Sequence, residues 1–209
     1  MSRFNRERLA KMNPTGIPWE EMTDEQKNAL RDEWDKVAGD PAQLYCTCPR
    51  TGCRNNHNCQ FCAALHRYYD GFPDCLRPLD EEMQTGVPKE YRYNMHLKIQ
   101  SDGTPPGIID PNDPDLSRQR LFEMAKNMTE EQKKVKRGAE RWAEIVRDPK
   151  NRACKCPHGD CRYHGNCVKC IALHRAYGSF PYCMNYITDL IEEKCDIYWA
   201  EHSKENKEV

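Results

Sequence analysis

Twelve of the thirteen cysteines in this chain fall into two sets with the same spacing. Each set follows the formula C-x-C-x4-C-x5-C-x2-C-x3-H-x8-C, once over residues 46–75 and once over residues 154–183. Thiolate and imidazole groups are the ligands that structural zinc sites use. We therefore expect a metal site in each copy. The candidate ligands are Cys46, Cys48, Cys53, Cys59, Cys62, His66 and Cys75 in the first copy, and Cys154, Cys156, Cys161, Cys167, Cys170, His174 and Cys183 in the second.

Each copy offers more ligands than one tetrahedral zinc ion needs. Three arrangements fit: one four-ligand site with spare thiols, two zinc ions that share bridging thiolates, or an iron-sulfur cluster held by four cysteines. The histidine favours zinc, and neither copy contains the C-x2-C-x2-C-x3-C-P pattern of bacterial ferredoxins. Zinc is the predicted cofactor, and an iron-sulfur cluster is the alternative. The first candidates for ligands are Cys59, Cys62, His66 and Cys75, with Cys167, Cys170, His174 and Cys183 as their counterparts.

Disulfide bonds are the competing use of so many cysteines. The N-terminal residues show no apolar signal segment, and no run of about eighteen apolar residues is long enough to span a membrane. We therefore predict a cytoplasmic protein, in which paired cysteines bind metal rather than each other. Only 38% of the residues are hydrophobic and 31% are charged, so two small modules would depend on bound metal for stability.

Charge and motifs narrow the function. The formal net charge is -1, which argues against a nucleic acid or an anionic membrane as partner. None of the common phosphate-binding, dinucleotide-binding or zinc-hydrolase motifs is present, which favours a role other than catalysis. We expect a structural zinc protein that serves as a protein-interaction or scaffolding module. The alternatives are an iron-sulfur electron carrier and a metal storage or transfer protein that uses the surplus thiols.

The spacing of the ligands also predicts the elements that carry them. Cys59, Cys62 and His66 are three and four residues apart, which places their side chains on one face of a helix. The same three ligands of the second copy repeat this spacing. Gly71 and Gly178 are predicted to end the two helices.

A capped helix is predicted before each copy. Residues 23–26 form a capping-box pattern, and Leu30, Trp34 and Val37 follow at helical spacing. Residues 129–132 repeat the capping box before the second copy. We expect each of these helices to pack on the metal module of its own copy.

The predicted fold is mainly α-helical, with small irregular knuckles stabilised by metal and a tandem duplicated module. The predicted segments are 1–21, an N-terminal loop with a helix from Arg6 to Met12; 22–77, a helix and the first metal module; 78–116, a linker rich in proline and glycine; 117–183, a helix and the second metal module; and 184–209, an amphipathic helix and a charged tail.

Two features lie outside the repeated unit. Apolar and polar residues alternate over 91–100, which predicts a strand inside the linker. A strand needs a partner, and a second chain is one candidate, which would make the protein a homodimer. The C-terminal helix is predicted to bury one apolar stripe, and Pro78 is predicted to prevent an equivalent helix after the first copy. The stripe consists of Ile187, Leu190, Ile191, Cys195 and Tyr198.

The complete formula resembles a family of small cysteine-rich cytosolic proteins of unknown function from anaerobic bacteria and archaea. Members share the same seven-ligand pattern and end in Leu-Pro-Ala-Cys. Here the proline and the cysteine of that ending match at Pro73-Asp74-Cys75 and Pro181-Tyr182-Cys183. The resemblance covers about 30 residues of each copy and implies a metal-binding cytosolic protein. It implies no reaction.

Overall fold

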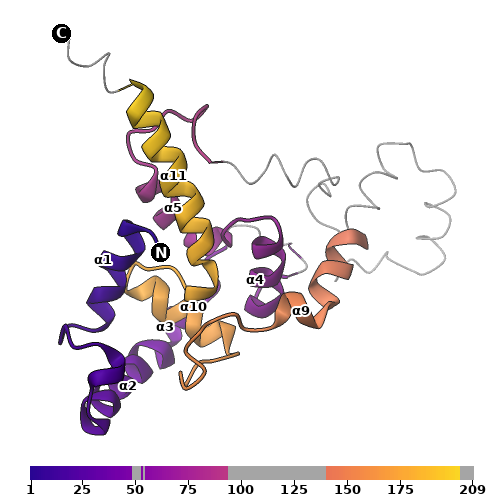
Figure 1. Ribbon diagram of the computed structural model, residues 1–209. Coiled ribbons are helices and arrows are strands. Elements are labelled where there is room, and N and C mark those ends of the chain that lie inside the picture. The colour runs from indigo at the N-terminus through magenta and orange to yellow at the C-terminus, as the bar shows by residue number, and fades with distance from the viewer. Residues whose placement is uncertain (49–52, 54, 94–139, 203–209) are drawn as a thin grey trace, which may run out of the picture.

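The computed structural model describes residues 1–48, 53, 55–93 and 140–202 (Figure 1). Within these ranges the chain is mainly helical and contains no strand, so the predicted helical class is confirmed there. Residues 91–93, which open the predicted strand, form a turn and a bend, and residues 94–100 lie outside the described ranges. The second capping box at 129–132 also lies outside them.

The N-terminal elements are α1 (Arg3–Met12), the 3-10 helix η1 (Trp19–Glu21), α2 (Asp24–Gly39) and α3 (Pro41–Leu44). Helix α1 begins before the predicted Arg6 because the Ser2 hydroxyl accepts a hydrogen bond from the Asn5 amide at 3.2 Å. The capping box of α2 is confirmed: Thr23 Oγ1 accepts from the Gln26 amide at 3.3 Å, and Gln26 Oε1 accepts from the Thr23 amide at 2.9 Å.

The two ligand helices are α4 (Cys59–Tyr68) and α10 (Cys167–Ala176), and both are confirmed. Asn58 and Asn166 cap their N-termini in the same way. The residues with positive φ after the helices are Asp70, at 54°, and Gly178, at 66°. Gly178 therefore has the predicted place, whereas the prediction for Gly71 is wrong by one residue, because an aspartate occupies the left-handed position in the first copy.

A 3-10 turn and a further helix follow the last cysteine of each copy. These are η2 (Asp74–Leu76) with α5 (Arg77–Met83), and η3 (Tyr182–Met184) with α11 (Asn185–His202). The expectation that Pro78 prevents a helix is wrong, because Pro78 lies in the first turn of α5, where the missing amide costs nothing. Ile187, Ile191 and Cys195 are buried as predicted, but Leu190 is 36% exposed.

The helix before each copy packs on the other copy, not on its own. Helix α2 lies against α10, with Ala38 and Leu173 in one buried cluster. The helical residues 140–147 pack through Ile145 against Leu65 of α4, and α9 (Pro149–Arg152) also contacts α4 (Figure 1). The expected packing within one copy is therefore wrong, and the two copies are interleaved.

One hydrophobic core lies between the two copies. Phe72 and Phe180, which follow the ligand helices at matching positions, stack with ring centroids 4.1 Å apart. Leu76 and Met184 are both fully buried in the same cluster. Thiols of both copies border this core, namely Cys59, Cys75, Cys167 and Cys183.

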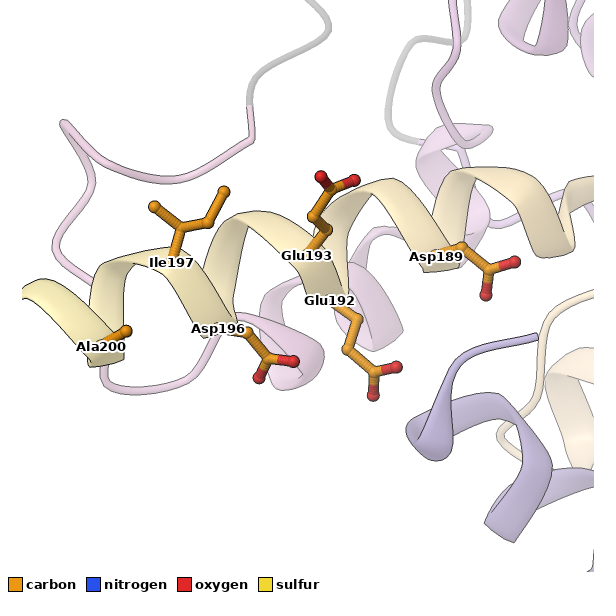
Figure 2. A pocket seen from close by; sticks show the side chains of 6 residues that line it. All are labelled: Asp189, Glu192, Glu193, Asp196, Ile197 and Ala200. Atoms are coloured by element: carbon orange, nitrogen blue, oxygen red, sulfur yellow. The ribbon is translucent and has the colours of Figure 1, made fainter.

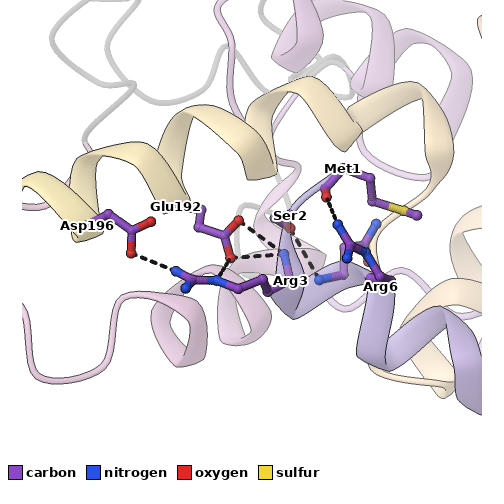
Figure 3. Close-up of polar contacts among 7 residues, drawn as sticks. Met1, Ser2, Arg3, Arg6, Glu192 and Asp196 are labelled. Atoms are coloured by element: carbon purple, nitrogen blue, oxygen red, sulfur yellow. Dashed lines mark hydrogen bonds and ion pairs between the residues drawn. The ribbon is translucent and has the colours of Figure 1, made fainter.

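Helix α1, at the N-terminus, packs along α11, the last helix of the described residues (Figure 1). Four acidic side chains project from α11 around a shallow surface pocket, as Figure 2 shows. Arg3 pairs with two of them, with its Nε 3.1 Å from Glu192 Oε1 and its Nη2 2.6 Å from Asp196 Oδ1 (Figure 3). Part of the acidic row is thus neutralised within the chain itself.

Among the residues described, no helix combines the length and the apolar character needed to cross a membrane.

Candidate metal centres

The six thiols of the first copy gather around the N-terminal half of α4, and we name them the first thiol cluster. Burial raises the pKa of Cys62 far above its usual range, and the nearby Cys75, Cys53, Cys48 and Cys59 raise it further. Burial also raises the pKa of Cys75 to about 11. The members are Cys46, Cys48, Cys53, Cys59, Cys62 and Cys75, and each is partly buried and outside any disulfide.

The second thiol cluster has the same composition around α10. Burial raises the pKa of Cys170 well above its usual value, and Cys183, Cys167, Cys161 and Cys156 raise it further. All six thiols line one cavity of about 490 Å³ together with His174. The members are Cys154, Cys156, Cys161, Cys167, Cys170 and Cys183, and each is again a partly buried free thiol.

Burial raises the pKa of Cys62, Cys75, Cys167 and Cys170, which favours the uncharged thiol at these four positions. Within the described residues, no three His, Cys, Asp or Glu side chains are grouped tightly enough to form a ready metal site. A metal ion binds the thiolate form, so binding would displace protons and draw the sulfur atoms together. The donor types themselves fit zinc or an iron-sulfur cluster, since Cys62 and Cys170 each lie within electrostatic range of four other thiols of the same copy.

His174 is the more fully buried of the two candidate histidines. Its side chain is 6% exposed, and burial lowers its pKa to about 4, which keeps the ring neutral. The Nδ1 atom lies 2.9 Å from Ser179 Oγ, and that hydroxyl in turn lies 3.3 Å from the His174 carbonyl oxygen. We assign Nδ1–H as the donor to Ser179 Oγ, because the hydroxyl then donates to the carbonyl. Nε2 is left as the nitrogen that can bind an ion.

The first copy holds its histidine differently. His66 is only partly buried in α4, and Gly71 stands where the second copy has Ser179. The hydroxyl that orients His174 therefore has no equivalent there. Ser179 escaped the sequence prediction because the spacing formula identifies ligands and not the groups that orient them.

Two arginines were also missed, although the tripeptide Leu-His-Arg occurs in both copies. Arg67 follows His66 and is 8% exposed, yet its partners lie in the second copy. Arg175 follows His174, and its partners lie in the first copy. Burial raises the pKa of Cys59, and the Arg175 guanidinium partly offsets that effect. Each arginine thus brings positive charge to the cluster of the other copy.

The remaining candidates have packing roles. Cys195, which stands outside both formulas, is 9% exposed and belongs to the shared core. Trp34 donates from Nε1 to the Met12 carbonyl at 3.0 Å, and Trp19 stacks on it with centroids 5.7 Å apart. His158 meets the ring of Tyr182 edge-on at 4.5 Å beside the second cluster.

Comparison with protein-family models, with curated protein sequences and with solved structures found no match to this chain. The class to which the protein belongs therefore rests on its own residues: a helical protein with two clusters of six thiols. The resemblance to the cysteine-rich cytosolic family remains a prediction from the spacing formula.

Proposed function

We propose that this protein binds zinc at each of its two thiol clusters and that the ions have a structural role. The observation that carries the proposal is the convergence of six thiols in each copy on one ligand helix. The two clusters would belong to a duplicated module, as the repeated formula indicates. Among the described residues no cysteine forms a disulfide, which leaves the sulfur atoms of both formulas able to bind a metal ion.

The chemistry of the clusters supports this role. Small domains with a modest apolar core need an additional source of stability, and a metal ion held by several thiolates supplies one. Binding of a structural zinc ion by a small module is worth about 10–16 kcal/mol near neutral pH. That is comparable to the whole free energy of unfolding of a typical domain, which is about 5–15 kcal/mol. The ions would therefore determine whether the clusters stay folded.

The proposed biological role is a protein-interaction or scaffolding module located in the cytoplasm. Its support is the net charge of -1, which gives no general attraction for nucleic acid, and the exposed apolar side chains along α11. These are Tyr186, Leu190, Ile197 and Trp199, which are 41%, 36%, 45% and 41% exposed.

The test is the metal content of protein purified without oxygen, for the natural sequence and for three serine variants. Cys62→Ser and Cys170→Ser should each reduce bound zinc, because each removes the thiol that lies near four other thiols of its cluster. Cys195→Ser is the matched control, since it removes a buried cysteine outside both clusters, and its zinc content should not change. Elemental analysis together with circular dichroism measures both binding and folding.

Other results would redirect the proposal. A brown protein with iron and sulfide in place of zinc would establish the iron-sulfur alternative. Many weakly held ions, with reactive thiols in the folded protein, would favour storage or transfer. A reduced chain that folds without any metal, or unchanged metal content in both Cys62→Ser and Cys170→Ser, would refute metal binding by these residues.

A further inference from the structure

Each thiol cluster is built partly by the other copy. Arg67 leaves the end of α4 and donates from Nη2 to the carbonyl oxygens of Asn151 and Ala153, at 2.5 and 3.3 Å. Ala153 is the residue directly before Cys154, the first thiol of the second cluster. Burial raises the pKa of Cys183, the Arg67 guanidinium partly offsets that effect, and Arg67 lines the cavity that holds the second cluster.

Arg175 makes the corresponding contacts in the opposite direction. It leaves the end of α10 and donates from Nη2 to the carbonyl oxygens of Gln43 and Tyr45, the latter at 3.3 Å. Tyr45 directly precedes Cys46, the first thiol of the first cluster. Arg175 Nη1 donates at 3.1 Å to the hydroxyl of Thr47, which lies between Cys46 and Cys48.

The two arginines bind backbone carbonyl groups at the same two positions of the repeat. Gln43 and Asn151 occupy one matching position of the repeat, and Tyr45 and Ala153 occupy the other. A guanidinium group offers several donors in a fixed planar arrangement, which suits it to hold two carbonyl oxygens at once.

We propose that Arg67 and Arg175 are positioning residues that each hold the Cys-x-Cys segment of the other copy, so that the two clusters bind metal ions as a coupled pair. This inference rests on the proposed metal binding. A bound ion orders the ligand helix of its own copy. That helix carries the arginine that aligns the thiols of the other copy. Coupling between two sites acts equally in both directions. A guanidinium beside a cluster of thiolates also offsets part of their negative charge.

The test measures which cysteines lose protection when an arginine is removed. The full-length chain is loaded with Zn²⁺, exposed to increasing concentrations of a chelator, and pulse-alkylated, and each cysteine is located by peptide mapping. Loss of a group that orients metal ligands typically lowers metal affinity about 10–100-fold. Arg67→Ala should therefore expose the cysteines of 154–183 at correspondingly lower chelator strength. Arg175→Ala should expose those of 46–75.

Arg141→Ala is the matched control, because Arg141 also reaches across the two copies, to the Tyr68 hydroxyl at 2.6 Å, but binds at the exposed surface. Its protection pattern should equal that of the natural sequence. If Arg67→Ala does not fold, Arg67→Lys decides: it keeps the charge and loses the paired donors, so residues 154–183 should still lose protection first. Exposure of 46–75 before 154–183 in an Arg67 variant, or equal effects for Arg67 and Arg141, would overturn the proposal. If Zn²⁺ protects no cysteine in the natural sequence, the proposed metal binding itself fails.

Discussion

At the scale of single residues, the second copy has the Ser179 hydroxyl beside His174, where the first copy has Gly71 at the matching position. The spacing formula located every thiol of both clusters, because ligand spacing is local in sequence. It could not locate Ser179, whose hydroxyl is 0% exposed with the rest of its side chain and acts on a histidine five residues away. It could not assign Arg67 or Arg175 either, since their partners lie more than eighty residues away along the chain.

Replacing Ser179 by alanine tests the role of that hydroxyl. His174 Nδ1 would lose its partner inside the protein, and an unpaired buried polar group costs about 1–3 kcal/mol. We expect the free energy of unfolding in urea to fall by that amount and zinc to be released earlier from cysteines 154–183. Thr85→Ala is the control, because the Thr85 hydroxyl is exposed and bonds only the Glu81 carbonyl oxygen, at 3.3 Å. Equal stability of the two variants would show that Ser179 does not orient His174.

At the scale of elements, short-range sequence patterns predicted where helices form. They did not predict which helices pack against each other. The capping box at residues 23–26 and the ligand spacing of α4 and α10 are short-range patterns, and the helices that they predict are present. Packing partners were predicted wrongly because both copies carry nearly the same apolar pattern. An apolar stripe on α2 fits either ligand helix equally well, so the sequence does not distinguish packing within one copy from packing between copies.

The attachment of α1 gives the second prediction. Asn5 is completely buried, and its side chain bonds Phe180 twice, donating to the carbonyl oxygen at 3.1 Å and accepting from the amide at 2.7 Å. Asn5→Ala leaves the carbonyl and the amide of Phe180 unpaired. We expect the free energy of unfolding to fall by about 1–3 kcal/mol for each group, and by less where water replaces the lost partner. Arg3→Ala, by contrast, breaks exposed ion pairs and should cost under about 1 kcal/mol (Figure 3). Urea unfolding of both variants measures the difference, and a larger effect for Arg3 would show that charge, and not the buried amide, holds α1.

At the scale of the whole molecule, the two copies share one buried cluster that lies between them, while α2 and residues 140–147 pack in two further clusters. Phe72 and Phe180 stack across the boundary between the copies, and cysteines of both clusters border the same group of side chains. Two modules with separate cores would unfold independently. A shared core, the crossed helices and the crossed arginines all connect the copies, so unfolding should be a single cooperative transition.

Phe180→Ala tests that cooperativity directly. Removing a fully buried phenylalanine costs about 3–5 kcal/mol, because the cavity that remains is only partly refilled. Since Phe180 supports both clusters, urea unfolding of the metal-loaded variant should shift to lower concentration as one transition, with circular dichroism, tryptophan fluorescence and cysteine alkylation in both copies changing together. Ile197→Ala is the control, because Ile197 is 45% exposed on α11. Its replacement should lower the free energy of unfolding by no more than about 0.5 kcal/mol. If alkylation of residues 154–183 advanced in Phe180→Ala while residues 46–75 stayed protected, each copy would have a core of its own and the shared-core account would be wrong.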